Sequence, residues 1–219
     1  ELLIQSGKGQ FGDQGSKELG QLLGMITGDG QITNRGNNKQ AAVINFWGEE
    51  RGLADDMAAV VNKLIADLAV TKREYSIHPV AVPERNMVFL RSVILARALE
   101  HYGFTKESKF KVPEVIWRGS EDCVKGYLRA LFQCDGTVNA TEQNLCCTIR
   151  LASSHPSLLK DVQILLANFG VLSRIHQRRK AGKRMLPDGK GGKKEYNCLA
   201  DHELIIGSDS REVFMREIG

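Results

Sequence analysis

The 219-residue sequence predicts an α+β fold in which a helix-strand-strand-helix-strand-strand-helix unit is duplicated with pseudo-twofold symmetry. The first observation behind this prediction is a repeated nonapeptide, LLGMITGDG at residues 22–30 and LRALFQCDG at residues 128–136. The second is that the halves keep corresponding beyond it, at a shift of 106 residues in the nonapeptides (22 to 128) and 105 after them (53 to 158). Repetition at this scale indicates two copies of one structural unit.

Each nonapeptide is predicted to end a helix that carries a stripe of small residues. Small residues recur at every fourth position in both copies: Gly20, Gly24 and Gly28 in the first, Gly126, Ala130 and Cys134 in the second. Residues four apart share one helical face, and small ones let a partner backbone approach closely. We therefore expect the two helices to form a tight pair, with Asp29 and Asp135 near a common axis.

The remaining elements follow from turn signals and apolar spacing. Polar, turn-rich stretches at 34–39 and 139–144 predict a β-hairpin after each first helix. Apolar residues at helical spacing from 53 to 64 and from 158 to 169 predict a second helix in each half, the latter opened by His155-Pro156. Four further strands are expected, at 73–77, 87–90, 196–199 and 203–206.

These elements group into an N-terminal half at residues 1–105, a connecting segment at 106–120 and a C-terminal half at 121–219. The hydrophobic content of 42% is ordinary for a globular chain. No apolar run reaches the roughly 20 residues that span a bilayer, and the five cysteines show no metal-ligand spacing. We expect an intracellular protein, cytoplasmic or nucleoid-associated, that does not interact with membranes.

With these motifs the chain resembles the two-repeat, monomeric LAGLIDADG homing endonucleases, in particular the endonuclease domains of inteins. The resemblance extends to KFKVPEVI at 109–116, LLKDVQILLANFGV at 158–171 and the closing segment 203–219. It implies that two antiparallel sheets form a saddle over DNA. It also implies a Mg²⁺ site built from Asp29, Asp135 and the carbonyls of Gly28 and Cys134, where Mn²⁺ or Ca²⁺ can substitute for binding.

Divalent metals suit this chemistry because they activate water, polarise the phosphorus centre and stabilise the leaving oxygen. The alternative for each Asp-Gly pair is a turn that leads the chain out of a helix. Two pairs in register favour the catalytic interpretation for Asp29 and Asp135.

In the family a basic side chain near the outer strands often polarises the attacking water or the phosphate. Arg91, at the end of the strand reading FLRS, is our candidate in the first half. The matching IIGS of the second half holds no Lys or Arg, so Lys180 or Lys183 would have to reach in, and cleavage of both strands at equal rates is in doubt. Lys109 and Lys111 are further candidates, although a linker lysine is more often exposed.

The charge distribution points to a DNA-contacting segment. Residues 174–194 carry a net charge of +8, whereas the whole chain carries +4, so the remainder carries −4. Because a Gly-rich run follows Pro187-Asp188, we expect a flexible basic loop connecting two strands, able to follow phosphates. A solvated loop is the alternative. The predicted DNA-binding residues are Arg174, Arg178, Arg179, Lys180, Lys183, Arg184, Lys190, Lys193 and Lys194.

Together these features predict a Mg²⁺-dependent endonuclease that cuts both strands of a long asymmetric site, of about 20 base pairs if each half follows one helical turn. One alternative is a DNA- or RNA-binding module of the same fold without cleavage, like a maturase or a regulator. Another is a purely structural duplication, which leaves the basic segment unexplained. Self-splicing needs a nucleophile first and an Asn last, so from Glu1 and Gly219 we do not expect splicing.

Overall fold

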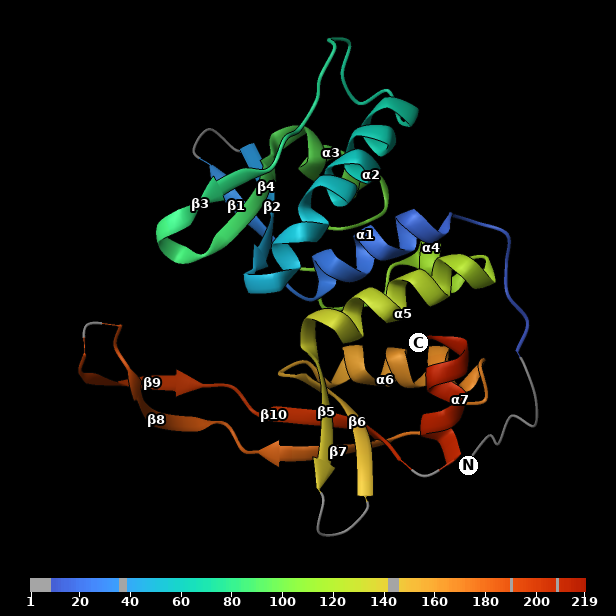
Figure 1. The fold of residues 1–219 in the computed structure, drawn as a ribbon, viewed down its shortest axis with the longest axis vertical. Coiled ribbons are helices and arrows are strands. Elements are labelled where there is room, and N and C mark those ends of the chain that lie inside the picture. The colour runs from blue at the N-terminus through green and yellow to red at the C-terminus, as the bar shows by residue number, and fades with distance from the viewer. Residues whose placement is uncertain (1–8, 36–38, 142–145, 190, 208) are drawn as a thin grey trace. The chain divides into compact units, whose positions relative to one another are not determined.

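The computed structural model describes residues 9–35, 39–141, 146–189, 191–207 and 209–219. Its contacts divide these residues into two compact units. The first unit runs from Gln10 to Cys134 and includes Ile218, and the second comprises Asp135–Glu217 with Gly9 and Gly219. Figure 1 shows the elements of each unit along the chain.

Among the described residues, the first unit contains five α-helices, of which α4 is only four residues long, and a four-stranded antiparallel sheet with the order β1-β2-β4-β3. Helix α3 packs on β2, and α2 packs on α1, α3 and β4. The elements are α1 (Lys17–Thr27), β1 (Gln31–Arg35), β2 (Lys39–Trp47), the 3₁₀ helix η1 (Gly48–Leu53), α2 (Ala54–Asp67), β3 (Val80–Val82), the 3₁₀ helix η2 (Pro83–Arg85), β4 (Met87–Ser92), α3 (Val93–His101), α4 (Glu114–Trp117) and α5 (Glu121–Asp135), whose last residue opens the second unit.

The second unit repeats the pattern of two strands, a helix, two strands and a helix. Its four-stranded antiparallel sheet has the order β5-β6-β10-β7, and α6 packs on β6, β7 and β10. A separate two-stranded sheet, β8-β9, lies between β7 and β10 in the sequence. The elements are β5 (Gly136–Thr141), β6 (Cys146–Ser153), α6 (Pro156–Ala167), β7 (Arg174–Arg179), β8 (Gly182–Pro187), β9 (Lys193–Cys198), β10 (Asp201–Ile206) and α7 (Asp209–Glu217).

Both units confirm the predicted α+β fold with antiparallel sheets. Alternation along the strands explains each core, because neighbouring residues of a strand point to opposite faces. In the first sheet Ile44, Phe46 and Leu90 are fully buried, and in the second Leu151 and Leu204 are buried. The second helix of each half is where apolar spacing predicted it, and His155 precedes the first residue of α6.

The strand predicted at residues 73–77 is wrong. This segment pairs with no strand, and the sheet takes β3 instead. The reason lies on α2, where Asn62 accepts a hydrogen bond from the N–H of Ile77 at 2.7 Å and donates one to its carbonyl at 3.0 Å. A side chain therefore satisfies the backbone groups that a neighbouring strand would otherwise bind.

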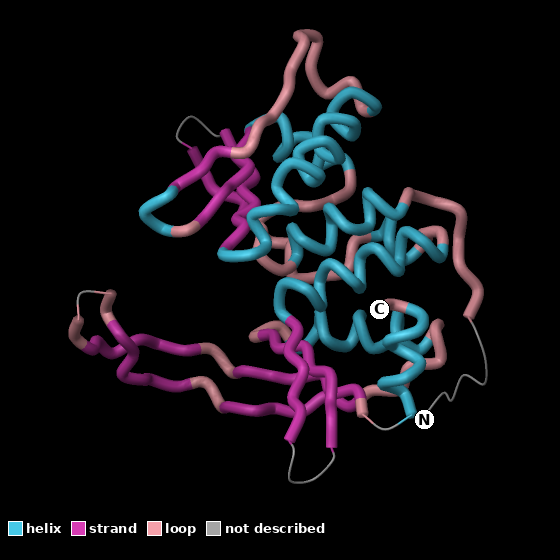
Figure 2. The backbone as a smooth tube through the Cα atoms, in the orientation of Figure 1, coloured by secondary structure: helices cyan, strands magenta, loops and turns pink. Residues whose placement is uncertain are grey.

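The prediction that the basic tract, residues 174–194, forms a loop is also wrong. Apart from Lys190, which lies outside the described residues, and Lys180, the basic residues of the tract lie on β7, β8 and β9. Figure 2 shows these strands as a long two-stranded ribbon with short interruptions. The Pro-Asp and Gly-rich stretch is only its turn: Asp188 N–H donates to Gly192 O at 3.0 Å, and Gly192 N–H donates to Asp188 Oδ1 at 2.9 Å. The strand expected at 196–199 belongs to this ribbon as part of β9.

Candidate functional site

Asp29 lies two residues beyond α1, in a turn whose backbone is fixed to the helix. The N–H of Gly28 donates to the carbonyl of Gly24 at 3.0 Å, and the N–H of Gly30 donates to that of Met25 at 3.0 Å. The amides on both sides of Asp29 are therefore bonded back to the last turn of α1. This arrangement holds the carboxylate at a defined place by the helix end.

The small-residue stripe is a backbone-to-backbone seam between α1 and α5, as predicted. A Cβ built on Gly24 would lie 2.4 Å from the carbonyl oxygen of Tyr127 and 2.9 Å from Cβ of Ala130. A Cβ on Gly20 would lie 2.0 Å from the carbonyl oxygen of Cys123, and one on Gly126 would lie 2.4 Å from that of Lys17. Real Cβ atoms do not approach this closely, so the seam requires these glycines.

A polar contact crosses the same seam near its end. The side chain of Tyr127 is fully buried, and its hydroxyl donates to Oγ1 of Thr27 at 3.3 Å. The Thr27 hydroxyl in turn donates to the carbonyl of Leu23 at 2.8 Å. Buried hydroxyls without partners are costly, so this chain of hydrogen bonds fixes α5 against the last turn of α1. It thereby positions the turn that carries Asp29.

Burial and two side chains from distant parts of the unit set the electrostatics of Asp29. Burial raises the pKa of the Asp29 carboxyl, while a hydrogen bond from the Cys134 thiol and the positive charge of Lys109 act in the opposite direction. The pKa of Glu50, in η1, is also raised, by burial first and then by the negative charge of Asp29. Asp29 and Glu50 are thus two carboxylates within electrostatic reach of each other.

Lys109 is the basic side chain at this turn. Its ammonium donates to the carbonyl of Gly28 at 3.4 Å and to the carbonyl of Gly30. Lys109 therefore contacts the carbonyls on both sides of Asp29, although it lies about 80 residues further along the chain. Of the two connecting-segment lysines raised as candidates from the sequence, the structure brings this one to the site.

The oxygen atoms around Asp29 fit a hard divalent cation. They are one carboxylate and backbone carbonyls that already face the positive charge of an ammonium, and Mg²⁺ prefers such oxygen ligands. Within the described ranges, no cluster of three or more His, Cys, Asp and Glu side chains could hold a metal ion. Water or phosphate oxygens would supply the remaining ligands.

The other predicted site residues stay predictions. Asp135 is the last residue of α5 and is exposed, and its role beside Asp29 is untested. The Cys134 thiol reaches Asp29, whereas a ligand role for the Cys134 carbonyl is also untested. Arg91 is exposed on β4. It pairs with Val43 on β2, which pairs in turn with Gln31 on β1, and Gln31 lies two residues after Asp29 in the sequence.

Several predicted DNA-binding residues already have partners. Lys183 lies 2.9 Å from Glu195, Arg178 lies 3.1 Å from Glu203, and the Arg184 guanidinium donates to the carbonyl of Lys180 at 2.9 Å.

Sequence reasoning also missed residues that the fold brings together. Glu50 and Arg150 stand in no local motif, since their partners come from other parts of the chain, and no spacing signal could have found them.

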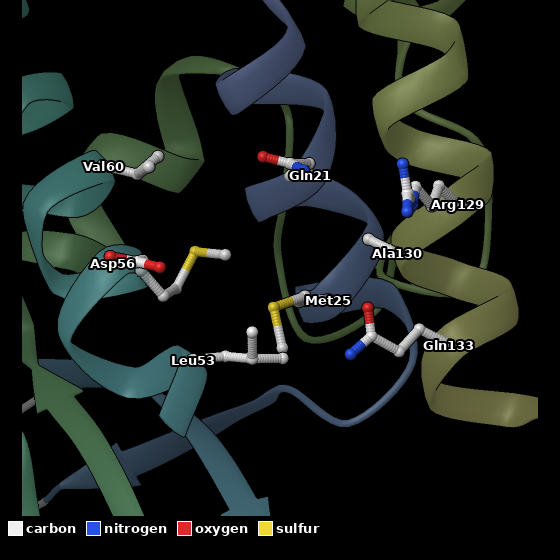
Figure 3. Close-up of a pocket in the computed structure, with 9 residues that line it drawn as sticks. Gln21, Met25, Leu53, Asp56, Val60, Arg129, Ala130 and Gln133 are labelled. Atoms are coloured by element: carbon white, nitrogen blue, oxygen red, sulfur yellow. The ribbon is translucent and has the colours of Figure 1, made fainter. Parts of the chain in front are cut away.

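The pocket in Figure 3 lies apart from these residues. It measures about 150 Å³ and is lined by side chains of α1, the η1–α2 segment and α5, with Met25, Leu53 and Met57 on its apolar side and Asp56 and Arg129 at its edge. None of the predicted site residues lines it. It therefore adds nothing to the site at Asp29.

Comparisons with known proteins agree with the fold. Residues 122–219 match the model of the LAGLIDADG-like domain. The homing endonuclease I-DmoI in complex with DNA and Ca superposes with a TM-score of 0.58 at 17% identity, covering 92% of this chain and 88% of that one. Residues 122–219 are thus a LAGLIDADG-like domain, and the chain has the fold of the homing endonucleases. I-DmoI in complex with DNA and Mn gives the same fold, with a TM-score of 0.57 at 18% identity over 92% of this chain and 96% of that one.

Two curated relatives are much longer than the chain. Ribonucleoside-diphosphate reductase NrdEB subunit alpha of Bacillus subtilis is 36% identical over 98% of the chain and 20% of its own length. Replication factor C small subunit of Thermococcus kodakarensis is 27% identical over 92% of the chain and 19% of its own length. The chain thus spans about a fifth of the length of these relatives. Among the described residues, none of the helices has the length and apolar character to cross a membrane.

Proposed function

We propose that this protein is a site-specific homing endonuclease that hydrolyses both strands of a long asymmetric DNA duplex with Mg²⁺. The observation that carries the proposal is the site at the end of α1. There Asp29 is partly buried and Lys109 donates to the carbonyls that flank it. A carboxylate and a cationic donor at one rigid turn are the groups that metal-assisted phosphodiester hydrolysis needs.

The residues have the following proposed roles. Asp29 and Asp135 bind Mg²⁺ through their carboxylates, and the carbonyls of Gly28 and Cys134 complete the protein ligands. When bound, the metal supplies activated water and stabilises the leaving oxygen. Lys109 holds the Gly28–Gly30 turn and places a positive charge beside the phosphate, and Arg91 supplies a second basic group from β4.

The proposed partner is double-stranded DNA of about 20 base pairs, one helical turn for each half, bound by a monomer inside the cell. I-DmoI, which shares the fold, is bound to DNA in its solved complexes. The strongly basic β7–β9 segment supports phosphate contact by this chain, because lysines and arginines that neutralise phosphates release counterions.

We further infer that the chain is a segment inserted into a host protein, as the endonuclease domain of an intein is. Its relatives carry the names of a reductase subunit and a replication factor subunit, and each is matched over only about a fifth of its length. One segment shared by large proteins of different function supports an inserted element.

The test is cleavage of a randomised duplex library with Mg²⁺, followed by sequencing of the cut ends. We expect the wild type to yield a defined site, and Asp29→Asn to lose cleavage by orders of magnitude while keeping specific binding. Lys109→Met should reduce cleavage strongly, and Lys111→Met, which removes a neighbouring exposed lysine, is the matched control. Full cutting by Asp29→Asn would contradict the assignment of the metal site.

The same experiment separates the enzyme from a binding module of this fold. A wild type that selects a defined duplex but leaves it intact in Mg²⁺ and in Mn²⁺ would be a DNA-binding regulator without cleavage. Selection from a single-stranded RNA library instead would indicate a maturase-like function.

A further inference from the structure

Three charged side chains form an Arg–Glu–Arg cluster on the second sheet. Glu203 on β10 places Oε2 at 3.4 Å from Nη1 of Arg150 on β6, and Oε1 at 3.1 Å from Nη1 of Arg178 on β7. Each carboxylate oxygen thus binds a different arginine, from the strands on either side of β10. Arg150 is held further by its Nε, which lies 3.1 Å from the hydroxyl oxygen of Thr148.

The cluster lies on the face of this sheet turned away from its core, which we call the outer face. Arg150 and Glu203 each precede a buried leucine on the same strand, Leu151 and Leu204. Because successive residues of a strand point to opposite sides, the two charged residues share the other side. On β7, His176 pairs with Glu203, and Arg178 lies two residues further along, so alternation places Arg178 on the same side.

The burial of the cluster is uneven. The side chain of Glu203 is only 11% exposed, whereas those of Arg150 and Arg178 are 31% and 47% exposed. A carboxylate with so little contact with water is stable here because it has two charged partners. Each guanidinium has five N–H donors in a planar fork, so contact with Glu203 leaves donors for another molecule.

The charge of the cluster argues against a phosphate site. Asp201 also lies near Arg178, with Oδ2 at 3.8 Å from Nη1. Two arginines facing two carboxylates have no net charge, so they add little to electrostatic attraction by DNA. What the arrangement provides is orientation, because two guanidinium planes are fixed on an exposed sheet face.

Oriented guanidinium groups are suited to reading base edges. An arginine donates two parallel hydrogen bonds to O6 and N7 of guanine in the major groove, and the pairing depends on the planar fork. We propose that Arg150 and Arg178 each read a guanine of the target duplex, and that Glu203 is a positioning residue that orients both. This inference rests on the proposed function, and specifically on binding of DNA by the outer face of the second sheet.

The experiment is selection of binding sites from a randomised duplex library in the absence of divalent metal, with the wild-type protein and single variants. Arg150→Lys and Arg178→Lys keep the charge but lose the fork. Each should lower the preference for guanine at one position about 5- to 150-fold, and the salt dependence of binding should stay unchanged. Arg216→Lys is the matched control and should keep the wild-type preferences, because Arg216 is an exposed arginine on α7, outside the sheet, that likewise contacts a glutamate, Glu217, at 3.0 Å.

Glu203→Gln should weaken both guanine preferences together, because it releases both arginines. Thermal unfolding verifies that each variant is folded, and the two lysine variants decide the question if Glu203→Gln does not fold. Wild-type preferences in both lysine variants would overturn the inference and leave the cluster as an ion-pair network of the sheet. A wild type that selects no sequence would instead overturn the proposed function itself.

Discussion

At the scale of single residues, the fold changes the pKa of the Asp29 carboxyl. Burial is the largest influence on its carboxyl and raises the pKa, and the Cys134 thiol and Lys109 only partly oppose it. A raised pKa means that ionisation of this carboxyl is less favourable in the folded protein than in the unfolded chain. A bound divalent cation would act in the opposite direction, since it stabilises the ionised form.

The first prediction concerns the stability of Asp29→Asn without metal. Because the pKa is raised in the folded state, the folded protein binds more protons than the unfolded chain, and its stability falls as the pH rises from the ordinary pKa of 3.8 through the raised pKa. Asparagine resembles the neutral form, so the variant should be more stable than wild type at neutral pH. The difference should vanish in acid.

Thermal unfolding in a chelator, over pH values from about 3 to 8, measures this difference on both sides of the ordinary pKa. Asp13→Asn, which changes an exposed carboxylate of the same unit, is the control. A variant less stable than wild type at neutral pH would show that the charge of Asp29 is favourable in the metal-free protein.

At the scale of elements, the pairing of α1 with α5 could be predicted from the sequence, whereas the third strand of the first sheet in chain order could not. The seam could be predicted because its small residues recur at every fourth position in both copies, and Gly24 and Ala130 do meet. The strand at 73–77 failed because Asn62, on another element, satisfies the backbone of Ile77. No pattern within 73–77 carries that information.

The second prediction tests the seam. Gly24→Ala would place a methyl group 2.4 Å from the carbonyl oxygen of Tyr127, so the helices must separate, at a cost of about 1 to 3 kcal/mol in the free energy of unfolding. Chemical denaturation measures this cost. Gly52→Ala is the control, because no atom lies within 4 Å of the Cβ that it adds.

Single-turnover cleavage by the same variant gives the second measurement. Since α5 contributes the Cys134 thiol to Asp29, separation of the helices should lower cleavage more than the loss of stability accounts for. Wild-type stability and activity in Gly24→Ala would show that the seam can open without consequence.

For the whole molecule, the sequence predicted where positive charge accumulates, but not how much of that charge is left unpaired within the protein and can face a partner. The +8 of residues 174–194 is a sum over positions and is independent of the fold. Which charges face a partner depends on pairing between strands, and on the β8–β9 sheet Lys183 is paired with Glu195. Likewise Arg150 and Glu203, 53 residues apart, meet only because β6 pairs with β10.

The third prediction uses the two faces of the β8–β9 sheet. Arg184 and Lys194 belong to one face, where the register places Tyr196 opposite Arg184 and Leu186 opposite Lys194. Lys183 and Lys193 belong to the other face, together with Glu195. Replacing Arg184 and Lys194 with Gln should weaken binding of duplex DNA and reduce its log-log salt slope by roughly 0.9 for each phosphate that the protein no longer neutralises.

The matched control replaces Lys183 and Lys193 with Gln, which removes the same formal charge. Its effect should be smaller, because Glu195 already neutralises Lys183. Equal reductions in affinity and slope for the two double variants, measured by salt titration with one duplex, would mean that both faces bind DNA or that neither does.

The hydrogen bonds between Asn62 and Ile77 have a consequence for protein engineering. They fasten the chain to α2 three residues before β3, and the hydroxyl of Tyr75 lies 2.6 Å from that of Ser92 on β4. An insertion ahead of Tyr75 therefore leaves both of these anchors in place. That path, after α2, extends away from the helices in Figure 1, and Lys72, Arg73 and Glu74 on it are exposed. A fluorescent tag or a small affinity domain inserted after Lys72 should leave the fold of this unit intact, giving a permissive point for labelling the protein.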